Sequence, residues 1–148
     1  QNEFDVIQIP INIFNSKIIN SGLLSELKKN NKIIFARSVY LQGLFFLNPK
    51  ELPTYLEKVK SKLESLCEIS KEYGRSIEDI SFSFIRDMSE IDSMIIGVES
   101  LNQLKNNIKL LDSPPLNDKL INKIYREFNN ISEEIVNPSL WNKWYYEK

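Results

Sequence analysis

Three short apolar runs, separated by segments with helical periodicity, constrain the fold of this chain more than any other feature. The runs cover residues 4–11, 32–38 and 93–98 and are rich in isoleucine, valine and phenylalanine. Strands that are apolar through most of their length and alternate with helices are typical of a parallel sheet covered by helices. The sequence therefore predicts an α/β fold with about three parallel strands, and the pattern alone is compatible with an open sheet or a closed barrel.

The helices between these runs have recognisable ends. A long helix is predicted over residues 52–73, with Gly74 placed to cap it. Another begins after Ser76 with a start that resembles a capping box, and a third is entered through Ser100. A further helix is predicted over residues 115–128, and the tail that follows it is rich in aromatic residues.

Composition excludes several classes of function. The 148 residues carry a net charge of -1 with both signs interspersed, which argues against a nucleic-acid-binding surface. No apolar run approaches the roughly 18 to 20 residues of a membrane-spanning helix, and the first ten residues lack the basic region of a signal peptide. The single cysteine, Cys67, excludes an intramolecular disulfide, so a reducing cytoplasm is predicted. The chain has no histidine, so no transition-metal site is expected.

Polar residues and glycines follow the apolar part of each predicted strand. Because the carboxyl ends of parallel strands meet at one edge of a sheet, these residues are expected to converge on one rim. A glycine there lets a ligand approach the backbone, and the start of the helix at Ser100 favours an anion. The set suits a flat ring and a phosphate, and it comprises Gln8, Asn12, Arg37, Ser38, Tyr40, Gln42, Gly43, Gly97 and Glu99.

Each of these positions also has a purely structural explanation. Arg37 can form an ion pair with a loop carboxylate, Gln8 can satisfy buried backbone, and Gly97 can mark a bend. Gln103 and Asn107 can belong to a solvated helix face. Tyr40 and the two tryptophans of the tail are equally compatible with packing. The residues taken one at a time therefore do not specify a function.

Taken together, four segments resemble the last part of an aldo/keto reductase, in the order and at about the spacing of that family. The resemblance extends from about residue 4 to residue 107, with a weaker echo in "NPSLW" at 137–141. The four segments are "DVIQIPINIFN" (5–15), "IIFARSVYLQG" (33–43), "CEISKEYGRSIEDISFSFIRD" (67–87) and "IDSMIIGVESLNQLKNNI" (91–108).

This resemblance implies the C-terminal portion of a (β/α)8 TIM barrel that binds a nicotinamide cofactor, NADP(H) with NAD(H) as the alternative. Gln8 matches the glutamine that holds the nicotinamide carboxamide. The loop that follows the pyrophosphate is matched by Ser38, Tyr40, Gln42 and Gly43. The adenosine end is matched by Gly97, Glu99, Gln103 and Asn107.

Two departures from the family pattern weaken parts of this assignment. Arg37 stands where many members have a tyrosine that stacks on the nicotinamide, although a guanidinium plane can also stack on a ring. Many members that prefer NADPH carry arginine or lysine at the positions of Gly97 and Gln103, where a 2′-phosphate would reward a cation.

The resemblance also implies that part of the barrel is missing. The family's catalytic Asp, Tyr, Lys and usual His lie on strands two to four, whereas this chain begins at the equivalent of strand six, and a whole barrel needs about 250 residues. Residues 1–112 are therefore expected to form a partial barrel, with the helix and aromatic tail of residues 113–148 packing on it. No catalytic residue is expected in the chain, which is predicted to be inactive alone.

Three functions follow as alternatives. The first is the cofactor-binding part of an NAD(P)H-dependent reductase whose full-length parent acts on a small carbonyl substrate. The second is a non-catalytic nucleotide-binding or regulatory relative, and the third is an inactive fragment. The open sheet is expected to meet the missing N-terminal portion or to self-associate through its edges. Barrel-lining side chains are expected to be exposed there, namely Ile7, Ile9, Ile34 and Ile95.

The aromatic tail has two possible uses. Its packing onto the barrel is the first expectation, and a contribution to the substrate pocket is the alternative. The side chains concerned are Trp141, Trp144, Tyr145 and Tyr146.

Overall fold

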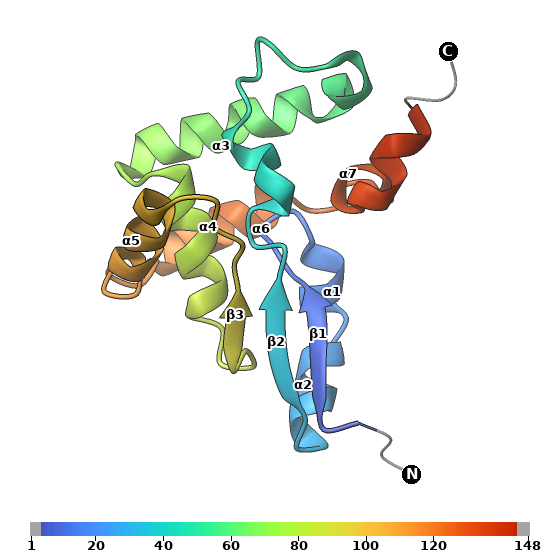
Figure 1. Cartoon of the computed structure of the whole chain (residues 1–148), viewed down its shortest axis with the longest axis vertical. Helices are drawn as coiled ribbons and strands as arrows, with labels where there is room; N and C mark the ends of the chain where they lie inside the picture. Colours follow the sequence, from blue (N-terminus) through green and yellow to red (C-terminus); the bar gives the residue numbers. More distant parts are fainter. Residues whose placement is uncertain (1–3, 145–148) are drawn as a thin grey trace.

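Three parallel strands form an open sheet, in the order in which they occur in the sequence. A computed structural model describes residues 4–144 and contains β1 (Val6–Pro10), β2 (Ile33–Arg37) and β3 (Ser93–Ile95). β1 pairs with β2 and β2 pairs with β3, and all three strands point in one direction (Figure 1). Within the described residues, β1 and β3 each have one unpaired edge. The predicted α/β class with three parallel strands is confirmed, and the sheet is open.

Helices connect the strands and cover one face of the sheet. Their ends match the predicted caps at three places: Gly74 has a left-handed backbone (φ 63°), and the side chains of Ser76 and Ser100 each accept a hydrogen bond from a first-turn amide. The helices are α1 (Ser16–Asn20), α2 (Leu23–Lys29), α3 (Lys60–Tyr73), α4 (Ile77–Arg86), α5 (Leu101–Leu110), α6 (Asp118–Glu127) and α7 (Glu133–Val136), and the 3-10 segments are η1 (Leu41–Phe46), η2 (Thr54–Val59) and η3 (Pro138–Trp144).

Two helical segments differ from the prediction. The helix predicted over residues 52–73 begins as η2 and becomes α-helical only at Lys60. Pro53, which precedes η2, disfavours helical backbone at the residue before it, and apolar steps of three and four residues do not separate a 3-10 turn from an α-helix. The short helix α1 was not predicted, because five residues carry too little periodicity to be recognised.

The orientation predicted for the strand side chains was wrong at three of four positions. Ile9 and Ile34 are 5% and 0% exposed and belong to the core, and Ile7 is partly buried against it, whereas Ile95 is 42% exposed. Successive side chains of a strand lie on opposite faces, so an error of one residue in assigning the faces exchanges the buried and the exposed side chains. Both faces carry apolar residues, so the apolar positions give no parity signal. The polar residues Gln8, Arg37 and Ser93 lie together on the face away from the core, and they were the available signal.

The uncovered face of the sheet, called the open face below, carries two rows of side chains. The strand register aligns Gln8, Phe35 and Ser93 in one row. It aligns Pro10, Arg37 and Ile95 in the next row, nearer the carboxyl ends of the strands.

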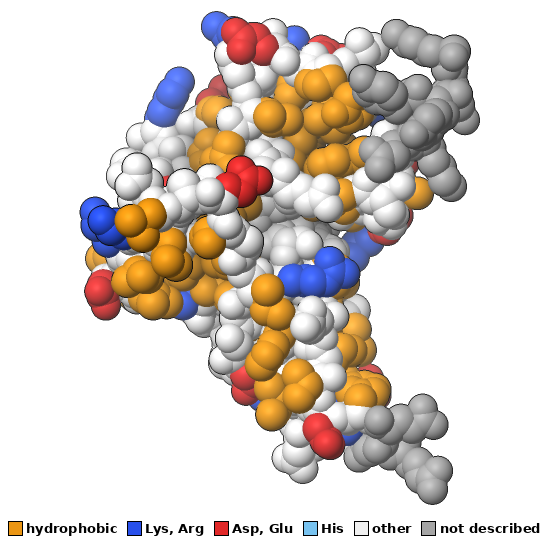
Figure 2. Space-filling model, viewed as in Figure 1, with side chains coloured by type: hydrophobic (Ala, Val, Ile, Leu, Met, Phe, Trp, Pro, Cys, Tyr) orange, Lys and Arg blue, Asp and Glu red, His pale blue; other side chains and the backbone are white. Residues whose placement is uncertain are grey.

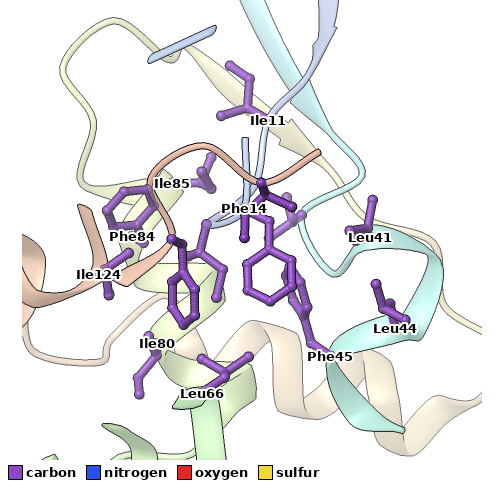
Figure 3. Close-up of a cluster of buried hydrophobic side chains, with 14 of the residues drawn as sticks. Ile11, Phe14, Leu41, Leu44, Phe45, Leu66, Ile80, Phe84, Ile85 and Ile124 are labelled. Carbon is purple, nitrogen blue, oxygen red and sulfur yellow. The ribbon is translucent and has the colours of Figure 1, made fainter. Parts of the chain in front are cut away.

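A cluster of aromatic and aliphatic side chains holds the loops at the carboxyl end of the sheet (Figure 3). The Phe14 ring lies 4.8 Å from the Phe45 ring and 4.8 Å from the Phe128 ring, measured between centroids. These three residues come from the segment after β1, from η1 and from the end of α6, and all are almost fully buried. Each aromatic contact of this kind stabilises the fold by about 0.5 to 1.5 kcal/mol beyond the contribution of the apolar area that it buries. The cluster therefore fixes the loop after β2 against the C-terminal helices.

The C-terminal part of the described chain shares this core. Leu116, Leu120 and Ile131 are buried in it, and Trp141 packs against it while its Nε1 donates to the carbonyl oxygens of Glu134 and Ile135. The side chain of Trp144, and all of Tyr145 and Tyr146, lie outside what the structure describes. Among the residues described, no helix is long and apolar enough to cross a bilayer.

Candidate functional site

A cleft lies where β2 and β3 end. It has a volume of about 740 Å³ and is lined by the loop after β2, the junction between β3 and α5, and Glu78 of α4. Eight of the ten residues predicted to contact the cofactor line it: Ser38, Tyr40, Gln42, Gly43, Gly97, Glu99, Gln103 and Asn107. The other two, Gln8 and Arg37, are exposed on the open face of the sheet and are not part of the lining.

The first wall of the cleft is a loop with unusual backbone angles. Residues Ser38, Leu41, Gln42 and Gly43 have φ values of 60°, 46°, 53° and 82°. Left-handed backbone costs about 1 to 2 kcal/mol for a residue with a side chain, and strain of this kind is concentrated at functional sites. Backbone hydrogen bonds hold the turns, from Leu41 N to Ser38 O and from Gly43 N to Tyr40 O, both 2.9 Å. Turns of this kind can present amide N–H groups to an anion.

Asn12, which the sequence places at the rim, is buried and positions this loop from beneath instead of facing a ligand. Its side chain is 1% exposed, and its Nδ2 donates to the carbonyl oxygen of Ser38 (3.3 Å) while its Oδ1 accepts from the Phe14 amide (3.0 Å). It therefore ties the end of β1 to the start of the loop. A single amide within the apolar run 9–14 was the signal in the sequence, because a buried polar side chain needs hydrogen-bond partners.

A hydrogen bond connects the two walls of the cleft. The Tyr40 hydroxyl donates to Asn107 Oδ1 (3.2 Å), and the Tyr40 ring lies 5.1 Å from that of Phe46. Burial, and then the negative charges of Glu78 and Asp79, raise the pKa of Tyr40 far above its usual range. The hydroxyl therefore stays protonated and acts as a donor, so it has little capacity to serve as a general acid.

The second wall is the β3–α5 junction, which satisfies much of its own hydrogen bonding. The Glu99 amide donates to Gln103 Oε1 (2.7 Å), and the Gln103 amide donates to Ser100 Oγ (3.2 Å). The Glu99 side chain is exposed at this junction. A Cβ on Gly97 would meet no heavy atom within 4 Å. Packing within the described protein therefore does not require glycine there, and the position leaves room for a ligand.

Arg37 provides a cation next to the cleft. Its Nη1 donates to Ser38 Oγ (3.3 Å), and Ser38 is a lining residue. No described carboxylate forms an ion pair with Arg37, so the structural explanation by a salt bridge is not observed in this part of the chain.

The cleft suits an elongated ligand with flat rings and a charged linkage. Its volume lies within the roughly 300 to 1,000 Å³ of small-molecule sites. A hydroxyl, a guanidinium and turn amides can hold a phosphate, while Tyr40 and Phe46 offer ring surface. Among the described residues, no group of three or more Cys, Asp or Glu side chains is placed to hold a metal ion.

A comparison of the sequence with models of known families identifies the family of this chain. A sequence profile described as "Aldo/keto reductase family" matches residues 2–127. The chain belongs to the aldo/keto reductase family. No curated protein sequence matches it at a significant level.

Solved aldo-keto reductases share the fold of this chain at low identity. The holo form of an aldo-keto reductase from Bacillus halodurans matches 92% of this chain with a TM-score of 0.69 and 15% identity. The glycerol dehydrogenase from Gluconobacter oxydans matches 86% with a TM-score of 0.63 and 18% identity. A thermostable aldo-keto reductase in complex with the inhibitor epalrestat matches 82% with a TM-score of 0.57 and 18% identity.

The chain spans only part of these family members. It covers 47% of the Bacillus halodurans structure, 45% of the Gluconobacter oxydans structure and 39% of the epalrestat complex. The three parallel strands and their helices therefore correspond to part of the (β/α)8 barrel of the family.

Proposed function

We propose that this chain is the cofactor-binding part of an NAD(P)H-dependent aldo/keto reductase. The observation that carries the proposal is the cleft of about 740 Å³, because residues from two segments some 60 positions apart line it together. The sequence predicts eight of those residues to be at the site, from their position at strand ends and from their match to the family pattern. An arrangement made only for packing would not need strained loop backbone and an open glycine at the same place.

The residues of the chain would act on different parts of the dinucleotide. Gln8 would hold the nicotinamide carboxamide, and Arg37 would place its guanidinium plane beside the ring. Ser38 and the turn amides that follow it would bind the pyrophosphate, with Tyr40, Gln42 and Gly43 shaping that part of the cleft. The β3–α5 residues Gly97, Glu99, Gln103 and Asn107 would contact the adenosine end. When bound, the nicotinamide supplies or accepts the hydride of the reaction.

We propose that the full-length protein reduces a small carbonyl substrate and that this chain alone does not. The Tyr40 hydroxyl is poorly suited to protonate a carbonyl oxygen, since its pKa is strongly raised and it is bound to Asn107. The proton donor would come from the remaining part of the domain. Cys67 is a free thiol, which supports a reducing compartment such as the cytoplasm.

Calorimetric titration of NADH and NADPH into the full chain tests this proposal. Saturable 1:1 binding of at least one of them is expected, and Ser38→Ala should weaken it several-fold because the hydroxyl and the hydrogen bond that it accepts from Arg37 are lost together. Ser65→Ala is the matched control, because that hydroxyl bonds Glu127 away from the cleft (2.8 Å). The absence of binding by a chain with native circular dichroism would contradict the proposal. Binding without carbonyl reduction by the full-length protein would favour a non-catalytic relative.

A further inference from the structure

The charge of the cleft bears on which dinucleotide it accepts. Its described lining contains two carboxylates, Glu78 and Glu99, and neither lysine nor arginine. Arg37 adds one positive charge, but beyond the lining and on the side of Ser38. A phosphate monoester on the ribose of the dinucleotide would add a charge of roughly -1.5 to -2. Such a group would enter a cleft that is already negative along its lining.

The β3–α5 junction uses part of its own hydrogen-bonding capacity and carries a carboxylate. Gln103 Oε1 accepts from the Glu99 amide, and Ser100 Oγ accepts from the Gln103 amide, so two backbone donors of the junction are already used. The exposed Glu99 carboxylate can only accept hydrogen bonds. It would repel a phosphate, whereas the two free hydroxyls of a ribose can donate to it.

The two lysines of α5 do not change this balance. Lys105 and Lys109 each follow a cleft residue, Gln103 or Asn107, by two positions. Two positions correspond to about 200° around an α-helix. The lysines therefore lie on the flank opposite the cleft, and neither lines it.

We propose that the adenosine ribose of the bound dinucleotide carries free hydroxyls that donate to Glu99, which makes NAD(H) the cofactor. This inference rests on the proposed function and reverses the preference for NADP(H) that the family resemblance implies. Glu78, the other carboxylate of the lining, adds to the discrimination.

Titration of NADH and of NADPH into the full chain, at low salt, tests this inference. NADH is expected to bind at least about tenfold more tightly, the factor that one unfavourable charge interaction near a protein surface produces. Glu99→Gln should tighten NADPH binding and narrow the ratio of the two dissociation constants. Glu64→Gln, an exposed carboxylate of α3 outside the cleft, should leave the ratio unchanged.

The outcomes separate this inference from the function on which it rests. If NADPH bound as tightly as NADH or more tightly, the inference would be overturned and the proposed function would stand. An unchanged ratio in Glu99→Gln would remove Glu99 from the discrimination. Failure of both dinucleotides to bind would overturn the proposed function and this inference together.

Discussion

At the scale of single residues, Tyr40 couples the two walls of the cleft. Its hydroxyl donates to Asn107 on a helix 67 positions away in the sequence. Because burial and then the charges of Glu78 and Asp79 raise its pKa in the folded state, folding favours the neutral form. The free energy of unfolding is therefore unaffected by this group below about pH 10 and falls as the pH rises above that value.

Tyr40→Phe should lower the free energy of unfolding at pH 7 by about 1 kcal/mol, the usual value of a net hydrogen bond. It should also reduce the loss of stability above pH 10 and speed amide hydrogen exchange in α5. Tyr125→Phe is the control, since that ring packs on Phe84 and its pKa is also raised by burial, then by Glu90, but it does not line the cleft. Unchanged exchange in α5 of Tyr40→Phe would show that the hydrogen bond does not hold the walls together.

Much of the site could be predicted at this scale because its residues follow strands. Ser38 and Gly97 both come directly or shortly after an apolar run, and parallel pairing brings such positions together without further information. Glu78 could not be predicted, because its presence depends on how α4 packs against the loop after β2. Arg37 was assigned to the site as a strand-end residue, but its side chain lies on the open face and outside the cleft lining. Position at a strand end does not by itself say to which face a side chain points.

At the scale of elements, the turn over residues 38–43 depends on backbone conformation. Gly43 has a φ of 82°, and a Cβ there would meet no atom within 4 Å, so the effect of a substitution comes from the backbone alone. Gly74, at the end of α3, has a φ of 63° and equally open surroundings. The two glycines therefore form a matched pair, one in the cleft lining and one outside it.

Gly43→Ala and Gly74→Ala should each lower the free energy of unfolding by about 1 kcal/mol, because alanine disfavours left-handed backbone. Only Gly43→Ala should also weaken dinucleotide binding, by several-fold, since it alters the turn that presents Ser38 and Gln42. Urea unfolding and calorimetry measure the two effects. Equal loss of binding in both variants would mean that the turn has no local role.

Elements with a chemical signal at their ends were predictable, and those without one were not. Ser76 and Ser100 cap helices as their hydroxyls indicated, and Gly74 ends α3 as its missing side chain indicated. The break at Lys60 has no such signal, since Val59 ends the 3-10 turn without a side-chain cap. The strain in the turn at Leu41 is likewise invisible in the sequence, because only the surrounding core holds a leucine there.

At the scale of the whole molecule, one side of the fold is not covered by any element within residues 4–144. Four large apolar side chains of α5 are exposed at steps of three and four residues, and so form one stripe: Leu101, Leu104, Ile108 and Leu111. Hydrophobic side chains gather over α5 and over the open face of the sheet in the same view (Figure 2). Beside the stripe, an apolar groove of about 440 Å³ runs between α5, α4 and the unpaired β3. Exposed edges and stripes of this kind recruit partners.

We propose that the rest of the barrel covers this surface in the full-length protein and that a second copy covers it when the chain is alone. The family structures to which the chain is similar are more than twice its matched length, which supports the first statement. The second statement follows from the hydrophobic effect, because association stabilises the complex by about 25 cal/mol for each Å² of apolar surface that it removes from water.

The isolated chain should therefore bind an apolar dye and show concentration-dependent association in analytical ultracentrifugation. Replacing Leu104 and Ile108 by lysine should reduce both signals, because a charged stripe cannot be buried in a contact between copies without a large desolvation cost. Asn106→Lys is the control and should leave both signals unchanged, because Asn106 is exposed and lies two positions, or about 200° around the helix, from both Leu104 and Ile108. A monomer that binds no dye at any concentration would show that the apolar stripe and the strand edges are satisfied within the chain itself.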